Sequence, residues 1–512
     1  MMLQHHANLA VALATLATER GWLDRPAIIT AGNTRTYAEL FAATQAYAAG
    51  LHAANVRSGD RILILLPDGF DCVATLLGAM WLGAVPVLGN PRSPRPELTT
   101  LVHRAEPTAV VCTKETADAL HGVWALRPEH LASTGHTAPA AETLVDGRPG
   151  YGLFTSGTTG DPKLCMHSHA DPLVHNQAFG RPVLELSPGD TVHSVSKLNF
   201  AYGLGNSVWY PLLNGATAVL EAAHPTAEQV LDTVAAHEVD ILFAVPSFYA
   251  KLLAHPDRGA LARLRIAVSA GEVLPPAIER GIMALHGPVV LNSIGSTEVG
   301  QAFAANSLRA QRFGTVGRAL APYRIQVVDS AGNRLPAGVE GSLEVVGPTV
   351  VQGRTMADVA EPPHRNLWQR TGDAAIVDPD GYLTVIGRLD DIEIVGGINV
   401  HPTEIEQMLL EYPTISDVAV CAVEDVSGIS RLVAYVVPTT PHIDPAELTT
   451  RVQHDLRPRI AGFKIPHAVV LVAEVPRTDT GKLRRTILRA AARRMQTTGS
   501  WQPYDQTLLR GN

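Results

Sequence analysis

Leu153-Phe154-Thr155-Ser156-Gly157-Thr158-Thr159-Gly160-Asp161-Pro162-Lys163 is the stretch from which the chain is best interpreted: a short apolar run enters a loop of glycines and small hydroxyl residues that ends at a lysine. Such a loop can present backbone N–H groups and hydroxyls to phosphate oxygens, and glycine lets the backbone approach closely. The pattern G-x-x-x-x-G-K-[ST] has no match, which disfavours a kinase or P-loop NTPase. The stretch predicts a phosphate-binding loop of another type, with a surface turn as the alternative.

Around this loop, short β-branched runs alternate with helical stretches rich in Ala and Leu. The runs RILILLP (61–67), AVPVLG (84–89) and AVVCT (109–113) are separated by a helix that ends near Met80 and by a polar helix. This rhythm is typical of βαβ units in a mostly parallel sheet. The stretch 128–149, rich in Pro, Gly, Ala and Thr, predicts a connecting loop.

The sequence pattern changes from Pro322 on, where runs of alternating apolar and polar residues are separated by Gly-Asn and Pro-Ala-Gly turns. These predict a small antiparallel β-rich subdomain over about 322–387. We therefore predict an α/β fold with a large N-terminal domain of βαβ layers over 1–389. A smaller α+β C-terminal lid is predicted over 390–512, which is long enough for a separate domain.

Composition excludes several functions. With 512 residues and 46% hydrophobic content, the chain can build more than one core. A net charge of -8 with dispersed Lys and Arg gives no nucleic-acid surface. The 4 cysteines form no C-x-x-C pair, which fits a reducing compartment and neither a disulfide framework nor a zinc site. No secretory signal and no clean apolar run of about 20 residues is found, so we expect a cytoplasmic protein without a membrane partner.

The loop motif T-S-G-T-T-G-x-P-K resembles the signature of the adenylate-forming superfamily, which comprises acyl-CoA synthetases, carrier-protein-loading adenylation domains and luciferases. Further motifs follow in the family's order: Ser269–Glu272 (SAGE), Ile294–Glu298 (IGSTE), Thr371–Asp373 (TGD), Gly387–Asp391 (GRLDD) and Pro476–Lys482 (PRTDTGK). The resemblance implies ATP- and Mg²⁺-dependent conversion of a carboxylic acid to an acyl-AMP, with release of pyrophosphate, followed by transfer of the acyl group to a thiol.

The resemblance also assigns the nucleotide site. Glu298 would bind Mg²⁺, Thr297 would contact the α-phosphate, and Lys482 would stabilise the charge that develops as the carboxylate attacks phosphorus. These three are the expected catalytic residues. The expected ATP- and AMP-binding residues are Thr155, Ser156, Gly157, Thr158, Thr159, Gly160, Lys163, Gly271, Glu272, Asn292, Ser293, Ile294, Gly295, Ser296, Asp373 and Arg388. Taken singly, Asp373, Arg388 and Glu298 are more often solvated surface charges, and only the motif context favours binding roles for them.

The class of acid substrate is indicated by the stretch Lys197–Asn206 (KLNFAYGLGN), which is similar to the acid-pocket stretch of benzoate-CoA ligases. No aspartate stands at Ala201 or Tyr202 to pair with an ammonium group, which disfavours an α-amino acid. The small Ala302 leaves room, and Gln301 offers a polar group for a ring substituent, so a substituted benzoate is expected. The expected substrate-binding residues are Phe200, Ala201, Tyr202, Gly203, Ala270, Gln301 and Ala302.

The acceptor thiol is left open, because CoA ligases and free-standing carrier-loading enzymes share these motifs. CoA is the favoured co-substrate, and the phosphopantetheine of an acyl or peptidyl carrier protein is the alternative. An inactive acid- or nucleotide-binding homologue is a third hypothesis. Asp390 is the expected hinge of the lid, and Gly396 and Gly397 are expected along the thiol tunnel. The sequence specifies neither the acid and its pathway nor the oligomeric state, with a homodimer among the states considered.

Overall fold

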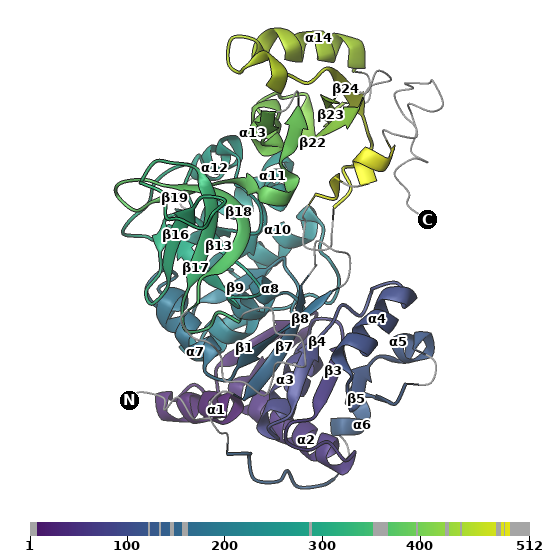
Figure 1. The fold of residues 1–512 in the computed structure, drawn as a ribbon. Helices are drawn as coiled ribbons and strands as arrows, with labels where there is room; N and C mark the ends of the chain where they lie inside the picture. Colours follow the sequence, from purple (N-terminus) through teal and green to yellow (C-terminus); the bar gives the residue numbers. More distant parts are fainter. Residues whose placement is uncertain are drawn as a thin grey trace.

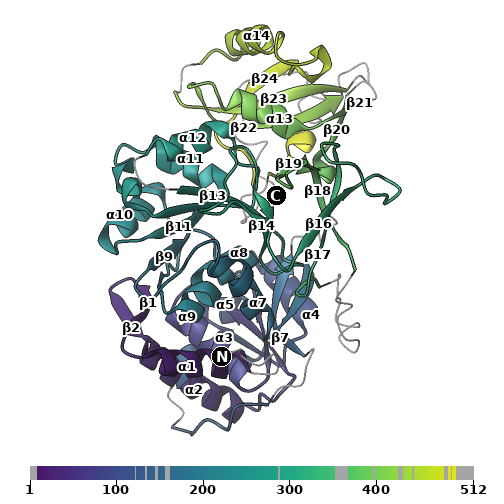
Figure 2. The same ribbon diagram turned by 90° about the vertical axis from the view of Figure 1, so that its left-hand side faces the viewer.

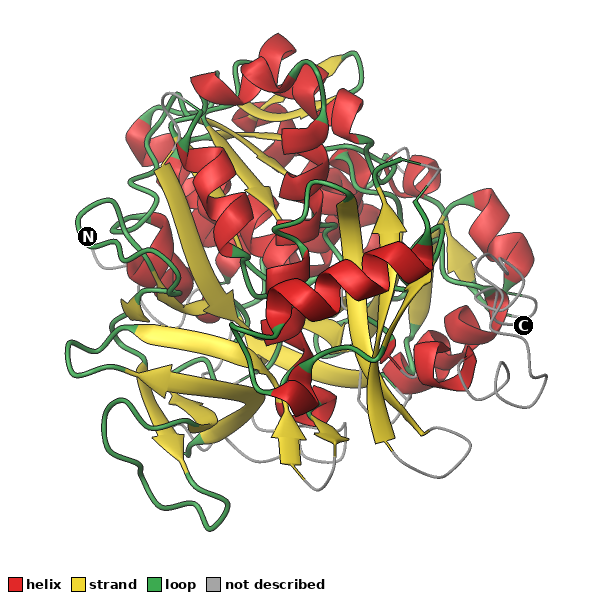
Figure 3. Ribbon diagram, turned by 90° about the horizontal axis from the view of Figure 1, so that it is seen from above, coloured by secondary structure: helices red, strands yellow, loops and turns green. Residues whose placement is uncertain are grey.

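The computed structural model describes residues 8–120, 123–132, 135–143, 148–155, 162–285, 289–351, 367–395, 398–424, 430–440, 443–477, 483–485 and 487–491. The predicted α/β class is confirmed, with a large N-terminal domain and a smaller C-terminal domain. Figure 3 shows helices and strands interleaved across the molecule. Within the described ranges, no helix is both long enough and apolar enough to cross a membrane.

The first N-terminal layer is a six-stranded sheet in the order β6-β5-β3-β4-β7-β8, parallel except for the β7–β8 hairpin. Its three central strands are apolar and buried along almost their whole length, as expected of a parallel sheet covered by helices. The strands are β3 (Arg61–Leu65), β4 (Val85–Leu88), β5 (Ala109–Cys112), β6 (Ala125–Leu126), β7 (Pro149–Thr155) and β8 (Lys163–Ser168). The accompanying helices are α1 (Leu9–Arg20), α2 (Tyr37–Ala53), α3 (Phe70–Trp81), α4 (Arg95–Ala105), α5 (Lys114–Ala119) and α6 (Pro128–Ala132).

The prediction of a connecting loop over 128–149 is wrong at its beginning, because Pro128–Ala132 form helix α6. Leu131 of α6 is buried against α2, where Gly50 has no side chain. A Cβ at Gly50 would lie 2.4 Å from the Leu131 carbonyl oxygen. The helix is therefore stabilised by a tertiary contact that its own Pro- and Ala-rich sequence does not reveal.

The second layer is a nine-stranded sheet in the order β15-β14-β13-β12-β11-β9-β10-β1-β2. Its strands are β1 (Pro26–Thr30), β2 (Asn33–Thr36), β9 (Thr191–Ser194), β10 (Thr217–Val219), β11 (Ile241–Ala244), β12 (Ile266–Ser269), β13 (Val289–Gly295), β14 (Ala302–Ala305) and β15 (Arg318–Ala319). Its helices are α7 (Asp171–His175), α8 (Ala201–Leu204), α9 (Tyr210–Asn214), α10 (Ala227–Ala236), α11 (Pro246–Ala254) and α12 (Pro276–Met283). Capping boxes fix the starts of α2 and α10, at Thr36 with Glu39 and at Thr226 with Gln229.

A four-stranded antiparallel sheet completes the large domain and lies beside β13 and β14 in Figure 2. It consists of β16 (Arg324–Val328), β17 (Gly341–Val346), β18 (Gln369–Val377) and β19 (Leu383–Arg388). Side chains such as Leu343 and Leu383 belong to the same apolar core as the two larger sheets. This sheet is therefore continuous with the large domain in packing.

The C-terminal domain, at the top of Figure 1, has its own apolar core. After a 3₁₀ turn (Leu389–Asp391) it contains β20 (Glu393–Val395), β21 (Ile398–Val400), α13 (Pro402–Leu409), β22 (Ile415–Glu424), β23 (Ser430–Pro438), α14 (Pro445–Leu456) and β24 (Ala468–Leu471). A core distinct from that of the large domain is what a separately moving unit requires.

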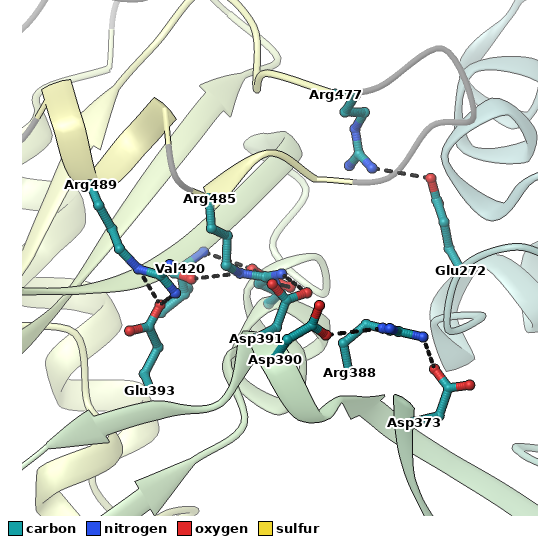
Figure 4. Close-up of polar contacts among 11 residues, drawn as sticks. Glu272, Asp373, Arg388, Asp390, Asp391, Glu393, Val420, Arg477, Arg485 and Arg489 are labelled. Atoms are coloured by element: carbon teal, nitrogen blue, oxygen red, sulfur yellow. Dashed lines mark hydrogen bonds and ion pairs between the residues drawn. The ribbon is translucent and has the colours of Figure 1, made fainter. Parts of the chain in front are cut away.

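Arg485 joins the start of this domain to its end (Figure 4). Its buried guanidinium donates to both Glu406 carboxylate oxygens, at 2.6 and 2.8 Å, and to Asp391 at 2.7 Å. Burial raises the pKa of Glu406, and the positive charge of Arg485 opposes this shift. The carboxylate of Glu406 therefore depends on Arg485 to remain ionised inside the domain.

We expect Arg485→Met to lower the free energy of unfolding by about 3–5 kcal/mol, because it leaves a buried carboxylate unpaired. Adding Glu406→Leu should recover much of the loss, since both charges are then removed. Urea unfolding of the full chain measures both effects. Arg459→Gln, which breaks a half-exposed ion pair with Glu411, is the control and should cost less than about 1 kcal/mol. A single variant as stable as the parent would contradict this role for Arg485.

Candidate active site

The site lies where four neighbouring parallel strands end. Strands β9, β11, β12 and β13 run parallel, so their carboxyl ends meet at one edge of the nine-stranded sheet. In open α/β sheets, ligands bind in the loops at this edge. The chain leaves the edge through 195–200, 245–247, 270–275 and 296–301. The structure thus brings together expected acid-binding and nucleotide-binding residues that are far apart in the sequence.

The acid-pocket stretch is fixed by close main-chain packing. Gln301 is buried, its amide nitrogen donates to the Ala201 carbonyl, and its amide oxygen accepts a hydrogen bond from the Tyr210 hydroxyl at 3.3 Å. A Cβ at Gly203 would lie 2.0 Å from the Lys197 carbonyl oxygen, so this position requires glycine. The contact of Gln301 with a ring substituent stays a prediction, and its present contacts hold the stretch 201–210 in place.

Aromatic and small side chains occur along the same stretch. The Tyr202 ring packs edge-on against Phe243, with centroids 6.2 Å apart, and its hydroxyl donates to the Val268 carbonyl at 3.2 Å. Ala201 is buried, whereas Phe200 and Ala302 are partly exposed. These side chains offer apolar surface, because the Tyr202 hydroxyl is already hydrogen-bonded to the main chain.

A buried ion pair that the sequence analysis missed supports the base of this stretch. Asp68, which follows β3, accepts hydrogen bonds from the Leu198 N–H at 3.2 Å and lies 3.9 Å from the Lys197 ammonium. Lys197 also donates to the Glu221 carbonyl at 2.6 Å. Burial raises the pKa of Asp68 to about 6, and Lys197 and Arg92 oppose this shift. The pair links the six-stranded sheet to the acid-pocket stretch.

On the nucleotide side, Gly271 and Glu272 follow β12. Gly271 adopts φ +91°, which favours glycine, and Glu272 accepts hydrogen bonds from the backbone N–H and hydroxyl of Ser247, both at 3.1 Å. Next to them on β13, the Asn292 amide nitrogen donates to the Thr315 carbonyl. The buried Asn292 Oδ1 accepts no hydrogen bond within the described part of the chain. It is available to a donor on a ligand.

Thr297 and Glu298 are held against the β7–β8 hairpin by His167. The Nε2 of His167 lies 2.8 Å from the Thr297 carbonyl oxygen, and its Nδ1 lies 3.1 Å from the Asp171 carboxylate. Neither His167 nor Asp171 was predicted from the sequence to have a role. A His and an Asp four residues apart indicate a pair on one helix, but His167 lies on β8 and Asp171 begins α7. Only the fold reveals that the histidine also reaches Thr297.

Asp373 and Arg388 face each other across β18 and β19 (Figure 4). The Arg388 guanidinium lies 3.3 Å from Asp373 and 3.1 Å from Asp390, and it donates to the Thr371 carbonyl at 2.8 Å. A Cβ at Gly372 would lie 2.5 Å from this guanidinium. The TGD motif thus places a glycine where the arginine needs space, and its binding of ribose stays a prediction.

Several expected site residues lie outside the described residues. They are Ser156, Gly157, Thr158, Thr159 and Gly160 of the phosphate loop, Gly396 and Gly397 of the thiol tunnel, and Lys482. The ends of the phosphate loop are described, and there Thr155 pairs with Lys163 across the β7–β8 hairpin.

Comparison with known proteins decides the family. The profile of the AMP-binding enzymes matches residues 16–353, and that of the AMP-binding enzyme C-terminal domain matches residues 404–482. The chain belongs to the AMP-binding enzyme family. The predicted superfamily and the predicted class, an AMP-forming acid–thiol ligase, are thereby confirmed.

This chain aligns with named relatives over most of its length. It is 37% identical to p-hydroxybenzoic acid–AMP ligase FadD22 of Mycobacterium tuberculosis, over 94% of this chain and 69% of that protein. It is 34% identical to benzoate–CoA ligase of Thauera aromatica, over 84% of this chain and 86% of that protein. A benzoate CoA ligase from Burkholderia xenovorans LB400 superposes with a TM-score of 0.86 at 29% identity, covering 94% of this chain and all of that one.

The Asp68 carboxylate gives this AMP-binding enzyme a pH-dependent stability. Because its pKa is raised from 3.8 to about 6 in the folded state, its contribution is complete below 3.8 and is lost as the pH rises through about 6. We expect the parent to lose up to about 1.4 kcal/mol per pH unit in this window, relative to Asp68→Asn. Melting curves from pH 4 to pH 8 measure the difference.

The control for this pH series is Asp118→Asn, which alters an exposed carboxylate on α5. Its melting temperature should follow that of the parent at every pH. Parallel curves for the parent and Asp68→Asn would instead contradict the raised pKa.

Proposed function

We propose that this enzyme activates a benzoate-type acid, foremost a hydroxybenzoate, to its aryl-AMP and then transfers the aryl group to CoA. The observation that carries the proposal is the convergence of the stretch 197–203 with Ala270–Glu272 and with 296–302 at one sheet edge. The named relatives act on p-hydroxybenzoic acid and on benzoate, and they support the aromatic acid.

The chemistry of the acid-pocket stretch supports an aryl acid. The Tyr202 ring, which packs edge-on against the buried Phe243, and the small side chains of Ala201 and Ala302 suit a flat ring, which gains by aromatic contact and by leaving water. Positions 201 and 202 carry no carboxylate that could pair with a substrate ammonium group. An α-amino acid would therefore bury its positive charge unpaired at these positions.

The nucleotide end suits ATP with Mg²⁺. The unpartnered Asn292 Oδ1 is a suitable acceptor for an exocyclic amino group of adenine. Burial, and then the negative charge of the nearby Glu298 carboxylate, raises the pKa of the Cys165 thiol on β8. No described residue forms an ion pair or hydrogen bond with that carboxylate. A single carboxylate together with phosphate oxygens is a usual magnesium site, and the ion would neutralise phosphate charge.

The protein then has to position two anions, the acid carboxylate and the α-phosphate of ATP. The acid carboxylate is already a nucleophile, so the reaction needs alignment and charge stabilisation more than a general base. His167 holds the Thr297 carbonyl, which orients the turn that presents Thr297 and Glu298. We assign the stabilisation of the reacting oxygens to Lys482, in line with its motif.

The acceptor has two candidates. The benzoate–CoA ligase relative favours CoA. The relative called p-hydroxybenzoic acid–AMP ligase is named for an aryl-AMP product and not for a CoA thioester. It favours the alternative, in which a carrier protein accepts the aryl group.

An acid screen with two acceptors tests the proposal. ATP–pyrophosphate exchange is measured with 4-hydroxybenzoate, 3-hydroxybenzoate, benzoate, cyclohexanecarboxylate and phenylalanine. We expect exchange with the hydroxybenzoates and none with phenylalanine. The best acid is then incubated with ATP and either CoA or a phosphopantetheinylated carrier protein, and thioesters are identified by mass spectrometry. Exchange only with non-aromatic acids would overturn the acid assignment, and thioester only on the carrier would replace CoA.

Lys482→Ala should lower acid-dependent pyrophosphate exchange at least about 100-fold, the scale for losing a preorganised charge partner of a transition state. The affinity for ATP, measured by calorimetry, should change far less. The matched control is Lys464→Ala, since Lys464 pairs with Glu404 within the C-terminal domain. Parental exchange by Lys482→Ala would remove the proposed role of this lysine.

Ala302→Ile should shift the acid preference from substituted rings toward benzoate. Ala302 begins β14 and pairs with Gly295, so a larger side chain would occupy the predicted pocket. A misfit of this size changes discrimination by about 1–3 kcal/mol, or roughly 10- to 200-fold. The ratio of kcat/KM for 4-hydroxybenzoate to that for benzoate measures the shift. An unchanged ratio would mean that residue 302 does not line the pocket.

A further inference from the structure

We infer that Arg477 is a positioning residue for adenylation, because its ion pair with Glu272 docks the C-terminal domain against the nucleotide side of the large domain. This inference rests on the proposed function and adds a residue to it. The motif containing Arg477 was assigned only for its terminal lysine.

The Arg477 guanidinium bridges the two domains (Figure 4). Its Nη1 lies 3.1 Å from Glu272 Oε1 in the large domain. Its Nε and Nη2 contact the two carboxylate oxygens of Asp417 on β22, at 3.3 and 2.8 Å. A planar guanidinium held by such a two-point contact has a fixed direction. Asp417 therefore aims the remaining nitrogen of Arg477 at Glu272.

On the other side, Glu272 is equally well fixed. It follows Gly271 at the end of β12, and the backbone N–H and hydroxyl of Ser247 hold its carboxylate. Burial raises the pKa of Glu272, and Arg477 opposes this shift. Without Arg477, a mostly buried carboxylate would lack its cation. The docked arrangement of the domains is therefore favoured, because it gives the Glu272 carboxylate a positive partner.

Arg477 is also tied to the residues that flank Lys482. Arg477 and Leu483 form an antiparallel β-bridge, and the Arg484 N–H donates to the Pro476 carbonyl at 2.9 Å. Lys482 itself lies outside the described residues, but it is bonded directly to Leu483. Docking Arg477 on Glu272 therefore fixes one end of the lysine-bearing segment relative to the nucleotide side.

A second polar contact between the domains offers a control. His401 Nε2 lies 2.8 Å from Glu340 Oε1, between the C-terminal domain and the loop before β17. This contact involves neither the 476–484 segment nor the carboxyl end of β12. If any contact between the domains sufficed, removing this one would have the same effect as removing Arg477.

The experiment separates the two half-reactions. In Arg477→Gln, the kcat of acid-dependent pyrophosphate exchange should fall about 10- to 100-fold, the scale for misplacing a reacting group by about 1 Å. KM for the acid should change less than about threefold. Thioester formation from preformed aryl-AMP should proceed at the parental rate or faster. Arg477→Lys should restore part of the exchange, because it keeps the charge but loses the two-point contact.

Two further variants complete the test. Asp417→Asn combined with Arg477→Gln should be little worse than Arg477→Gln alone, as expected for partners in one interaction. Glu340→Gln should leave exchange unchanged. Parental exchange in Arg477→Gln, equal loss of both half-reactions, or an equal effect of Glu340→Gln would each overturn the inference.

Hydrogen exchange followed by mass spectrometry gives a readout that does not depend on the acid. The amides of Ser247, which donates to Glu272, and of Arg477 should lose protection in Arg477→Gln and keep it in Arg459→Gln. Unchanged protection in Arg477→Gln would overturn the docking role. If the parent shows no exchange with any aryl acid but these protection differences are found, the proposed function fails while the docking contact stands.

Discussion

Parallel pairing of β9, β11, β12 and β13 is the constraint on which the site depends. Because these strands are neighbours and point the same way, each chain segment that leaves them emerges at the same edge. The register places Ser269 beside Asn292, so the segments that follow begin level with each other. The predicted acid-binding and nucleotide-binding groups meet there without a long excursion of any loop. The fold thus concentrates the chemistry at one edge before any individual side chain is considered.

Buried polar contacts then join the layers at this edge. Asp68 connects the six-stranded sheet to Lys197, and His167 connects the same sheet to Thr297. A buried charge or imidazole is costly unless it is paired, so such contacts tolerate little displacement. They hold the six-stranded sheet against Lys197 and Thr297 more strictly than apolar packing would, since side chains in an apolar core can repack.

Local patterns predicted most of the fold, and contacts between distant residues account for what was missed. The apolar runs at β3, β4 and β5 and the amphipathic α13 are visible in sequence because burial imposes local periodicity. The hydrogen bond from His167 to Thr297 joins residues 130 apart, and the ion pair of Arg477 with Glu272 joins residues 205 apart. No local spacing encodes such pairs. Motif resemblance assigned roles to Thr297, Glu298, Asp373 and Arg388, which stay predictions, but it could not name the residues that hold them in place.

The ion pairs around the 3₁₀ turn anchor both sides of the predicted hinge at Asp390. Arg388 is clamped to the large domain by the Thr371 carbonyl and Asp373, while Asp391 is clamped to the C-terminal domain through Arg485. The predicted hinge therefore has its backbone freedom at Leu389 and Asp390, between these two anchored residues. Rotation at this hinge would move the C-terminal domain as one body. It would also act on the ion pair of Asp390 with Arg388, which therefore opposes the rotation.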